Sequence, residues 1–239
     1  MQWLILVFWS LRMAICRHSR RFSLLRAGMA LGLACAMALQ LVLLHLDGML
    51  TLETALPLHL CGLFGVLSIP LLFYPKGPLW EASAFLGAPA AACALVYPAV
   101  IPCSHPLLMR AAFIQLHALV ALVPCAVLLT GKPLPVRPRR TLLFGSGYLL
   151  AISWFNHAFG TNYLFLRAAP SGTPLEWFLS RGTAFYVCSL LIICMVVFSC
   201  LQGLYCRINE RFSPLTAGNS SAYSRYGHCT PPCTSRDQG

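Results

Sequence analysis

The stretch LPLHLCGLF, residues 56–64, places a histidine and a cysteine inside an otherwise apolar segment. A cysteine thiol attacks an ester carbonyl only as the thiolate, so it needs a nearby base to accept its proton. Ionisable side chains are costly within a membrane and mark functional sites by default. His59 and Cys61 are therefore the first candidates for chemistry in this chain.

Two further histidines, His117 and His157, lie in other apolar segments, and Asn156 directly precedes the second of them. An imidazole can act as the general base for a thiol. An asparagine can orient that imidazole or donate a hydrogen bond to the oxyanion that forms on the ester. We expect Cys61, His117 and His157 to be the catalytic residues.

The helices that carry these residues can be predicted from where the charged residues fall along the sequence. Hydrophobic residues make up 58% of the sequence and charged residues 10%, and the charges fall between long apolar runs. A helix needs roughly 20 apolar residues to cross about 30 Å of hydrocarbon. The runs that reach this length are 27–46, 54–75, 82–109, 111–131, 141–166 and 182–206, and a shorter run covers 1–16.

These runs predict an all-α, polytopic membrane helix bundle of about seven transmembrane helices over residues 1–207. The small-residue run GAPAAACA, residues 87–94, is expected at its crowded centre. Residues 208–239 become rich in Ser, Pro, Gly and Thr from position 212 onward. Such a composition is typical of disorder, so we expect a disordered cytoplasmic tail there.

The formal net charge of +11 is spread unevenly over the connections. Basic residues gather in alternate connections and after the last run: Arg17, Arg20, Arg21, Arg26, Lys76, Lys132, Arg137, Arg139, Arg140, Arg207 and Arg211. Because basic loops stay in the cytoplasm, this pattern predicts a cytoplasmic C-terminus and an external N-terminus. The charge therefore indicates a multi-pass protein of the cell membrane and no nucleic-acid partner.

In this topology Cys61, His117 and His157 all lie in the outer half of the membrane, within about two helical turns of a span end. No acidic residue is expected at that depth. A Cys, His, Asp triad is therefore excluded at this stage, and a Cys, His, Asn arrangement is predicted instead.

The loop TNYLFLRAAPSGTPLEW, residues 161–177, emerges just above His157. Arg167 has the bidentate geometry that suits a lipid phosphate. Tyr163 and Trp177 equally suit a plain anchor at the headgroup level. The alternative hypothesis is that this loop is a lid over the site and that its Arg167 binds a lipid phosphate. The substrate-binding residues are then expected to be His59, Asn156, Asn162, Tyr163 and Arg167.

Three motifs, LPLHLCG, QLHALVALVP and WFNHAFGTNYLFLRAAPSGTPLEWF, resemble those of the bacterial YwaF-like integral membrane proteins. That family is in turn similar to animal transmembrane protein 164, a lipid acyltransferase that uses a membrane cysteine and a histidine. The resemblance covers roughly residues 20–207. It implies a helical membrane fold and places the cysteine at Cys61 and the histidine at His117.

Three function classes follow from these residues. A lipid acyltransferase or lipid hydrolase explains cysteine and histidine together, requires no cofactor, and has membrane lipid as its partner. A transporter or channel explains the prolines and small residues, but no acidic residue within the predicted spans is available to couple ions. The third class is a metal-binding protein, since His59, Cys61, His117 and His157 are suitable ligand types. It ranks last because His59 and Cys61 are two residues apart and would point away from each other on a regular helix. The sequence leaves the substrate, the acyl donor and the oligomeric state open.

Overall fold

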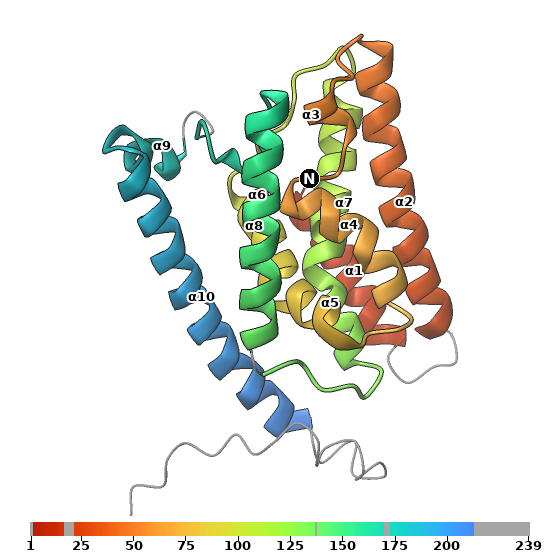
Figure 1. Cartoon of the computed structure of the whole chain (residues 1–239). Coiled ribbons are helices and arrows are strands. Elements are labelled where there is room, and N and C mark those ends of the chain that lie inside the picture. Colours follow the sequence, from red (N-terminus) through yellow and green to blue (C-terminus); the bar gives the residue numbers. More distant parts are fainter. Residues whose placement is uncertain (1, 17–21, 137, 170–172, 213–239) are drawn as a thin grey trace, which may run out of the picture.

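The computed structural model describes residues 2–16, 22–136, 138–169 and 173–212, and within these ranges the chain is helical and contains no strand (Figure 1). The elements in chain order are α1 (Gln2–Cys16), α2 (Phe22–Leu46), α3 (Leu52–Ala55), α4 (Leu60–Leu71), α5 (Gly77–Ala82), the π-helix η1 (Ser83–Gly87), α6 (Ala88–Val96), α7 (Pro106–Leu128), α8 (Arg139–Phe159), the 3₁₀ turn η2 (Tyr163–Phe165), α9 (Pro174–Ser180) and α10 (Thr183–Phe212).

Five helical segments among the described residues are long and apolar enough to cross a membrane: Phe22–Leu46, Leu52–Leu71, Gly77–Val96, Pro106–Leu128 and Thr183–Arg211. The prediction of an all-helical membrane bundle is confirmed. The helix α8 is 21 residues long but is less apolar than these five segments, and the apolar part of α1 is short. The count of seven spans and the orientation of the termini stay predictions.

The predicted boundary between the runs 82–109 and 111–131 is wrong. We placed it at the charge of Arg110, but Arg110 lies inside α7, and the helices are separated by the loop from Tyr97 to His105. This loop, YPAVIPCSH, is itself apolar, so the charge pattern does not reveal it. Pro98 and Pro102 interrupt helical hydrogen bonding there, and Pro106 occupies the first turn of α7.

The centre of the bundle is α7, which packs against α1, α2, α4 and α6. In the most apolar part of α7, 61% of the residues are buried inside the protein, whereas the corresponding share for the segment Gly77–Val96 is 44%. The small-residue helix that we expected at the centre, α6, instead lies beside α7. Directly before α6, Gly87 at the end of η1 permits close approach to α4, because an added Cβ at Gly87 would lie 2.6 Å from Cγ of Phe64.

The last helix, α10, is fastened to the bundle mainly near its C-terminal end. Tyr205 donates a hydrogen bond of 2.8 Å to the carbonyl of Ala84 in η1, and its ring packs on Phe85. The Asn209 amide pairs with both backbone groups of Leu134 at 2.9 Å. Towards its N-terminal end α10 diverges from α8 and approaches α9 (Figure 1).

The predicted cytoplasmic tail lies largely outside the described residues. Helix α10 continues past residue 207, the expected end of the bundle, and ends at Phe212. The expectation of disorder over the rest of the tail therefore stays a prediction.

Candidate functional site

The candidate cysteine lies in the first turn of α4, directly after a break in the helix. Residues 56–59 separate α3 from α4, and Pro57 lies within this break. His59 is the N-cap of α4 with extended backbone angles, φ −70° and ψ 146°. Cys61 follows as the second residue of the helix and is a half-buried free thiol. Irregular backbone is tolerated at membrane depth only where protein or a cavity satisfies its polar groups.

Neighbouring elements satisfy several carbonyls of this break and of α3. The Tyr148 hydroxyl of α8 donates a 2.6 Å hydrogen bond to the Leu58 carbonyl. The Tyr163 hydroxyl donates to the carbonyls of Leu52 and Leu56. The loop after α8 is thus docked onto the segment that leads to Cys61.

The side chain of Asn156 sets the course of that loop. Helix α8 ends at Phe159, and Gly160 follows at φ 67°, a left-handed conformation that glycine adopts without strain. Asn156 is 1% exposed. Its Oδ1 accepts hydrogen bonds from the Thr161 hydroxyl at 2.9 Å and from the Tyr163 amide at 2.8 Å, and its Nδ2 donates to the Tyr163 carbonyl at 2.8 Å.

Two consecutive residues of η2 have unusual backbone angles. Leu164 and Phe165 have φ values of 59° and 56°, in the left-handed region that is unfavourable for large side chains. The Tyr186 hydroxyl of α10 holds the Phe165 carbonyl at 3.0 Å. The ring of Phe165 lies 5.1 Å from the ring of His59. The strained turn therefore places an aromatic side chain against the N-cap of α4.

Tyr163 of the same turn also packs against the His59 ring. Its ring is fully buried, with its centroid 5.0 Å from that of His59. Burial raises the pKa of Tyr163, and the negative charge of nearby Glu53 raises it further. The tyrosine therefore acts here as a neutral hydrogen-bond donor and packing residue.

Asn162 closes the second half of the loop. Its Oδ1 accepts hydrogen bonds from the amides of Arg167 at 2.9 Å and Ala168 at 3.1 Å, and its Nδ2 donates to the Ala168 carbonyl at 2.8 Å. Asn156, Asn162 and Tyr163 were predicted to bind substrate. The structure gives their side chains partners within the protein, so their evident role is to shape the loop.

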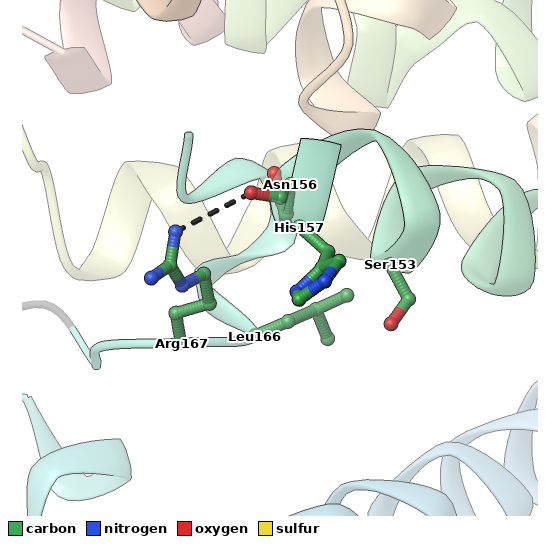
Figure 2. A pocket seen from close by; sticks show the side chains of 5 residues that line it. All are labelled: Ser153, Asn156, His157, Leu166 and Arg167. Atoms are coloured by element: carbon green, nitrogen blue, oxygen red, sulfur yellow. Dashed lines mark hydrogen bonds between the residues drawn. The ribbon is translucent and has the colours of Figure 1, made fainter. Parts of the chain in front are cut away.

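A pocket of about 190 Å³ lies where this loop meets α8, and it is lined by Ser153, Asn156, His157, Leu166 and Arg167 (Figure 2). One guanidinium nitrogen of Arg167 donates to the Asn156 carbonyl at 3.3 Å. Within the described ranges Arg167 forms no ion pair. Both Arg167 and His157 are exposed, so the pocket presents a cation and an imidazole to an incoming group.

The third predicted catalytic residue, His117, lies elsewhere. It is on α7, is 5% exposed, and its Nδ1 hydrogen-bonds the Phe113 carbonyl at 2.7 Å. Its ring packs against that of Phe113 at a tilt of 32°, with the two centroids 4.0 Å apart. Neither His117 nor Cys61 lines the pocket that contains His157. The structure joins His157 with Arg167 in this pocket, whereas Cys61 lies at the start of α4 and His117 in the interior of α7.

The expectation that the spans hold no acidic residue is wrong. Glu53 falls within the segment Leu52–Leu71, and it interacts electrostatically with His59. Glu81 lies in α5 and forms an ion pair of 3.5 Å with Arg140 at the start of α8. We had used these charges as the limits of apolar runs, but helices extend past such charges when the side chain has a partner.

Sequence reasoning also missed Tyr148, whose hydroxyl donates a hydrogen bond to the break before α4. No local pattern distinguishes it, because its partner Leu58 lies 90 positions away. The metal site that the sequence offered as a third alternative is not formed: among the described side chains, no group of three or more His, Cys, Asp or Glu residues could hold a metal ion.

The model of the TMEM164 family matches residues 1–202, most of the chain, and the protein belongs to this family. The similarity to animal transmembrane protein 164 predicted from the motifs is confirmed. Family and apolar helices together identify a multi-pass integral membrane protein. No curated protein and no solved structure matches the chain.

Proposed function

We propose that this member of the TMEM164 family is a membrane-embedded enzyme that transfers or hydrolyses the acyl group of a lipid ester, with Cys61 as the nucleophile. One observation carries the proposal: Cys61 is a free, half-buried thiol in the first turn of a helix that begins inside the bundle. The other cysteines of the spans have no comparable position at a helix start.

The start of α4 suits this chemistry for an electrostatic reason. The first amides of a helix have no intrahelical partner, and the helix dipole places partial positive charge there. In α4 the first amide bound to the helix backbone is that of Leu63, which donates to the His59 carbonyl at 2.9 Å. The amides of the preceding turn can therefore stabilise a Cys61 thiolate and the oxyanion of its attack on an ester.

The pocket beside Arg167 supplies the second part of the proposal, a place for the substrate headgroup. Arg167 and His157 are exposed, and the described residues provide no carboxylate partner for Arg167. A guanidinium binds a phosphate through two parallel hydrogen bonds. The loop from Thr161 to Ala168 is the lid of this arrangement, with its shape fixed by Asn156 and Asn162.

The proposed membrane orientation puts the N-terminus outside and the C-terminus in the cytoplasm, as the basic connections indicate. Both the break before α4 and the Arg167 loop then face the outer leaflet. A reporter fused after Arg211 should behave as cytoplasmic, and one inserted at Thr173 as external. A cytoplasmic reporter at Thr173 would invert the assignment and move the site to the inner leaflet.

Lipid analysis of cells tests the enzymatic proposal. Cells that express the protein should differ from cells without it in the acyl composition of a lipid class, and Cys61→Ser should abolish the difference. Cys188→Ser is the matched control, because Cys188 is an exposed cysteine of α10. A difference that persists in Cys61→Ser at equal abundance, or that Cys188→Ser also removes, would contradict the proposal.

A further inference from the structure

Helix α10 is fixed to the rest of the protein at two points and is uncovered between them. Near its start, the buried Tyr186 donates a hydrogen bond of 3.0 Å to the Phe165 carbonyl of the loop after α8. Further along, the ring of Phe198 packs on Phe85 of η1 with centroids 5.6 Å apart. Between these two points none of the residues 187–197 is buried. The two points are about 18 Å apart along the helix, more than half of the roughly 30 Å hydrocarbon layer.

This exposure on all sides is unusual for a helix of a bundle. A helix that packs lengthwise on its neighbours buries a residue in every turn, because successive side chains point to different faces. Over residues 187–197 no neighbouring element of the described chain covers α10, and Figure 1 shows α10 diverging from α8 here. The large apolar side chains of this stretch are 42–64% exposed: Leu191, Ile192, Ile193, Met195 and Val196.

The facing wall is a stripe of α8. At spacings of three or four residues, which keep side chains on one side of a helix, it consists of Leu142, Ser146, Leu149, Ser153 and His157, and none of these is buried. The small serines leave room beside the helix. At its outer end the stripe lines the pocket that contains Arg167 (Figure 2).

The pocket and the uncovered part of α10 meet at the loop after α8. Leu166 and Arg167, which line the pocket, directly follow Phe165, whose carbonyl Tyr186 of α10 binds. An opening therefore lies between the α8 stripe and residues 187–197, with the polar pocket at one end and the contact of α10 with η1 at the other. We call it the lateral window.

The chemistry of the lateral window changes along its length in the order found in a phospholipid. At the pocket, Arg167 forms no ion pair within the described ranges and can bind a phosphate through two parallel hydrogen bonds. Along residues 187–197, VCSLLIICMVV, the side chains are almost all apolar. A free phosphate would use only the pocket and a plain hydrocarbon only the apolar part, whereas a phospholipid uses both.

We propose that the lateral window admits one membrane phospholipid, with its phosphate at Arg167 and an acyl chain along residues 187–197 of α10. The inference rests on the proposed function, which places a lipid headgroup in that pocket, and adds the route of entry and the site of the chain. Cys194 lies within the uncovered stretch, and Cys93 of α6 is near enough to interact electrostatically with both Cys194 and Cys61. The chain therefore runs past the neighbourhood of the proposed nucleophile.

Photocrosslinking tests the site without requiring turnover. The full-length protein in detergent is titrated with a phosphatidylcholine that carries a diazirine in the middle of one acyl chain, irradiated and digested, and labelled residues are identified by mass spectrometry. We expect saturable labelling of residues 187–197 that unlabelled phosphatidylcholine competes away. A diacylglycerol with the same diazirine chain lacks the phosphate and should need about tenfold higher concentration for equal labelling.

Two variants test the two ends of the site. Arg167→Gln should raise the half-saturating concentration of the phosphatidylcholine probe about tenfold. Ser153→Trp should block the lateral window from the α8 side and abolish the saturable labelling. Ala34→Trp is the matched control, because Ala34 is also a small exposed residue in a long helix, α2, and it should change nothing. If Ser153→Trp lowers the melting temperature and Ala34→Trp does not, Arg167→Gln decides.

Several results would overturn the proposal. Labelling that does not saturate, or that covers exposed residues of α2 and α10 equally, would show contact with bulk lipid only. Equal labelling by the diacylglycerol and phosphatidylcholine probes, or an unchanged titration in Arg167→Gln, would show that the phosphate is not bound. A protein dimer in which residues 187–197 stay unlabelled would assign the lateral window to a second copy of the chain.

This result is separable from that of the lipid analysis, because labelling is measured equally well in Cys61→Ser. If labelling is specific but Cys61→Ser leaves lipid composition unaltered in cells, the proposed enzymatic function fails and the phospholipid site stands. If Cys61→Ser abolishes the lipid difference while labelling is that of bulk lipid, the function stands and the site in the lateral window fails.

Discussion

Replacing Gly87 by alanine should destabilise the bundle through a single contact. A Cβ at this position would lie 2.6 Å from Cγ and 2.9 Å from Cβ of Phe64. Carbon atoms at their optimal separation are about 3.5–4.0 Å apart. The Cβ of Phe64 is attached directly to the α4 backbone, so rotation of the ring does not relieve the overlap. The two helices must move apart by roughly 1 Å to reach that separation.

The expected cost follows from overpacking. Forcing a methyl group into a packed core costs about 1–3 kcal/mol, while the better helix propensity of alanine returns up to about 1 kcal/mol. Because Phe64 is fully buried and cannot withdraw, we expect the upper end, a net loss of about 2 kcal/mol. In a chain of this size that lowers the melting temperature by roughly 4–8 °C, at 2–4 °C for each kcal/mol.

Thermal unfolding in detergent measures the effect, with Gly147→Ala as the matched control. Gly147 also lies inside a helix, α8, but an added Cβ there meets no atom within 4 Å. It should leave the melting temperature unchanged or raise it slightly. Adding Phe64→Leu to Gly87→Ala should recover part of the loss, because the two changes share one contact. Equal melting temperatures for Gly87→Ala and Gly147→Ala would refute the close approach of α4 and η1.

Three further substitutions probe the loop, the core and the pocket. Asn156→Leu removes three hydrogen bonds from the turn after α8. The loop 160–168 should then be cleaved by proteases at least tenfold faster, which corresponds to a loss of about 1.4 kcal/mol of protection. An unchanged cleavage rate would contradict the role of Asn156 in shaping the loop. Thr141 is fully buried, and its hydroxyl has no hydrogen-bond partner among the described residues. Thr141→Val replaces this side chain by one of the same shape and should raise stability by about 1 kcal/mol, whereas a loss would mean that the hydroxyl is satisfied. Arg167→Lys should weaken lipid turnover several-fold at normal abundance, while turnover that survives Arg167→Ala would reduce Arg167 to an anchor.

The helical membrane fold could be predicted from the sequence because apolar runs and charges report directly on the bilayer. Helix boundaries could not be read from charge alone. The apolar loop from Tyr97 to His105 breaks a run that contains no charge, and Arg110 lies within a helix that it was expected to separate. Prolines gave the better signal, because they limit hydrogen bonding whatever the solvent.

The candidate site was predictable in its residue types but not in its pairings. Cys61 was a candidate from its residue type, but the break directly before it, which makes it the second residue of α4, was not predicted. The contact of His59 with Tyr163 joins positions more than a hundred residues apart. Long-range packing of this kind leaves no trace in local spacing, so the sequence does not reveal which side chains surround His59.

The central claim is that the Cys61 thiol carries an acyl group during turnover. The most direct measurement incubates the purified protein with a lipid ester, stops the reaction at low pH, and examines the proteolytic peptide that contains Cys61 by mass spectrometry. We predict an added acyl mass on Cys61 that hydroxylamine at neutral pH removes, as expected for a thioester, and that is absent from Cys61→Ala. An acyl mass on another residue, or lipid turnover by Cys61→Ala at the rate of the unaltered protein, would contradict the account.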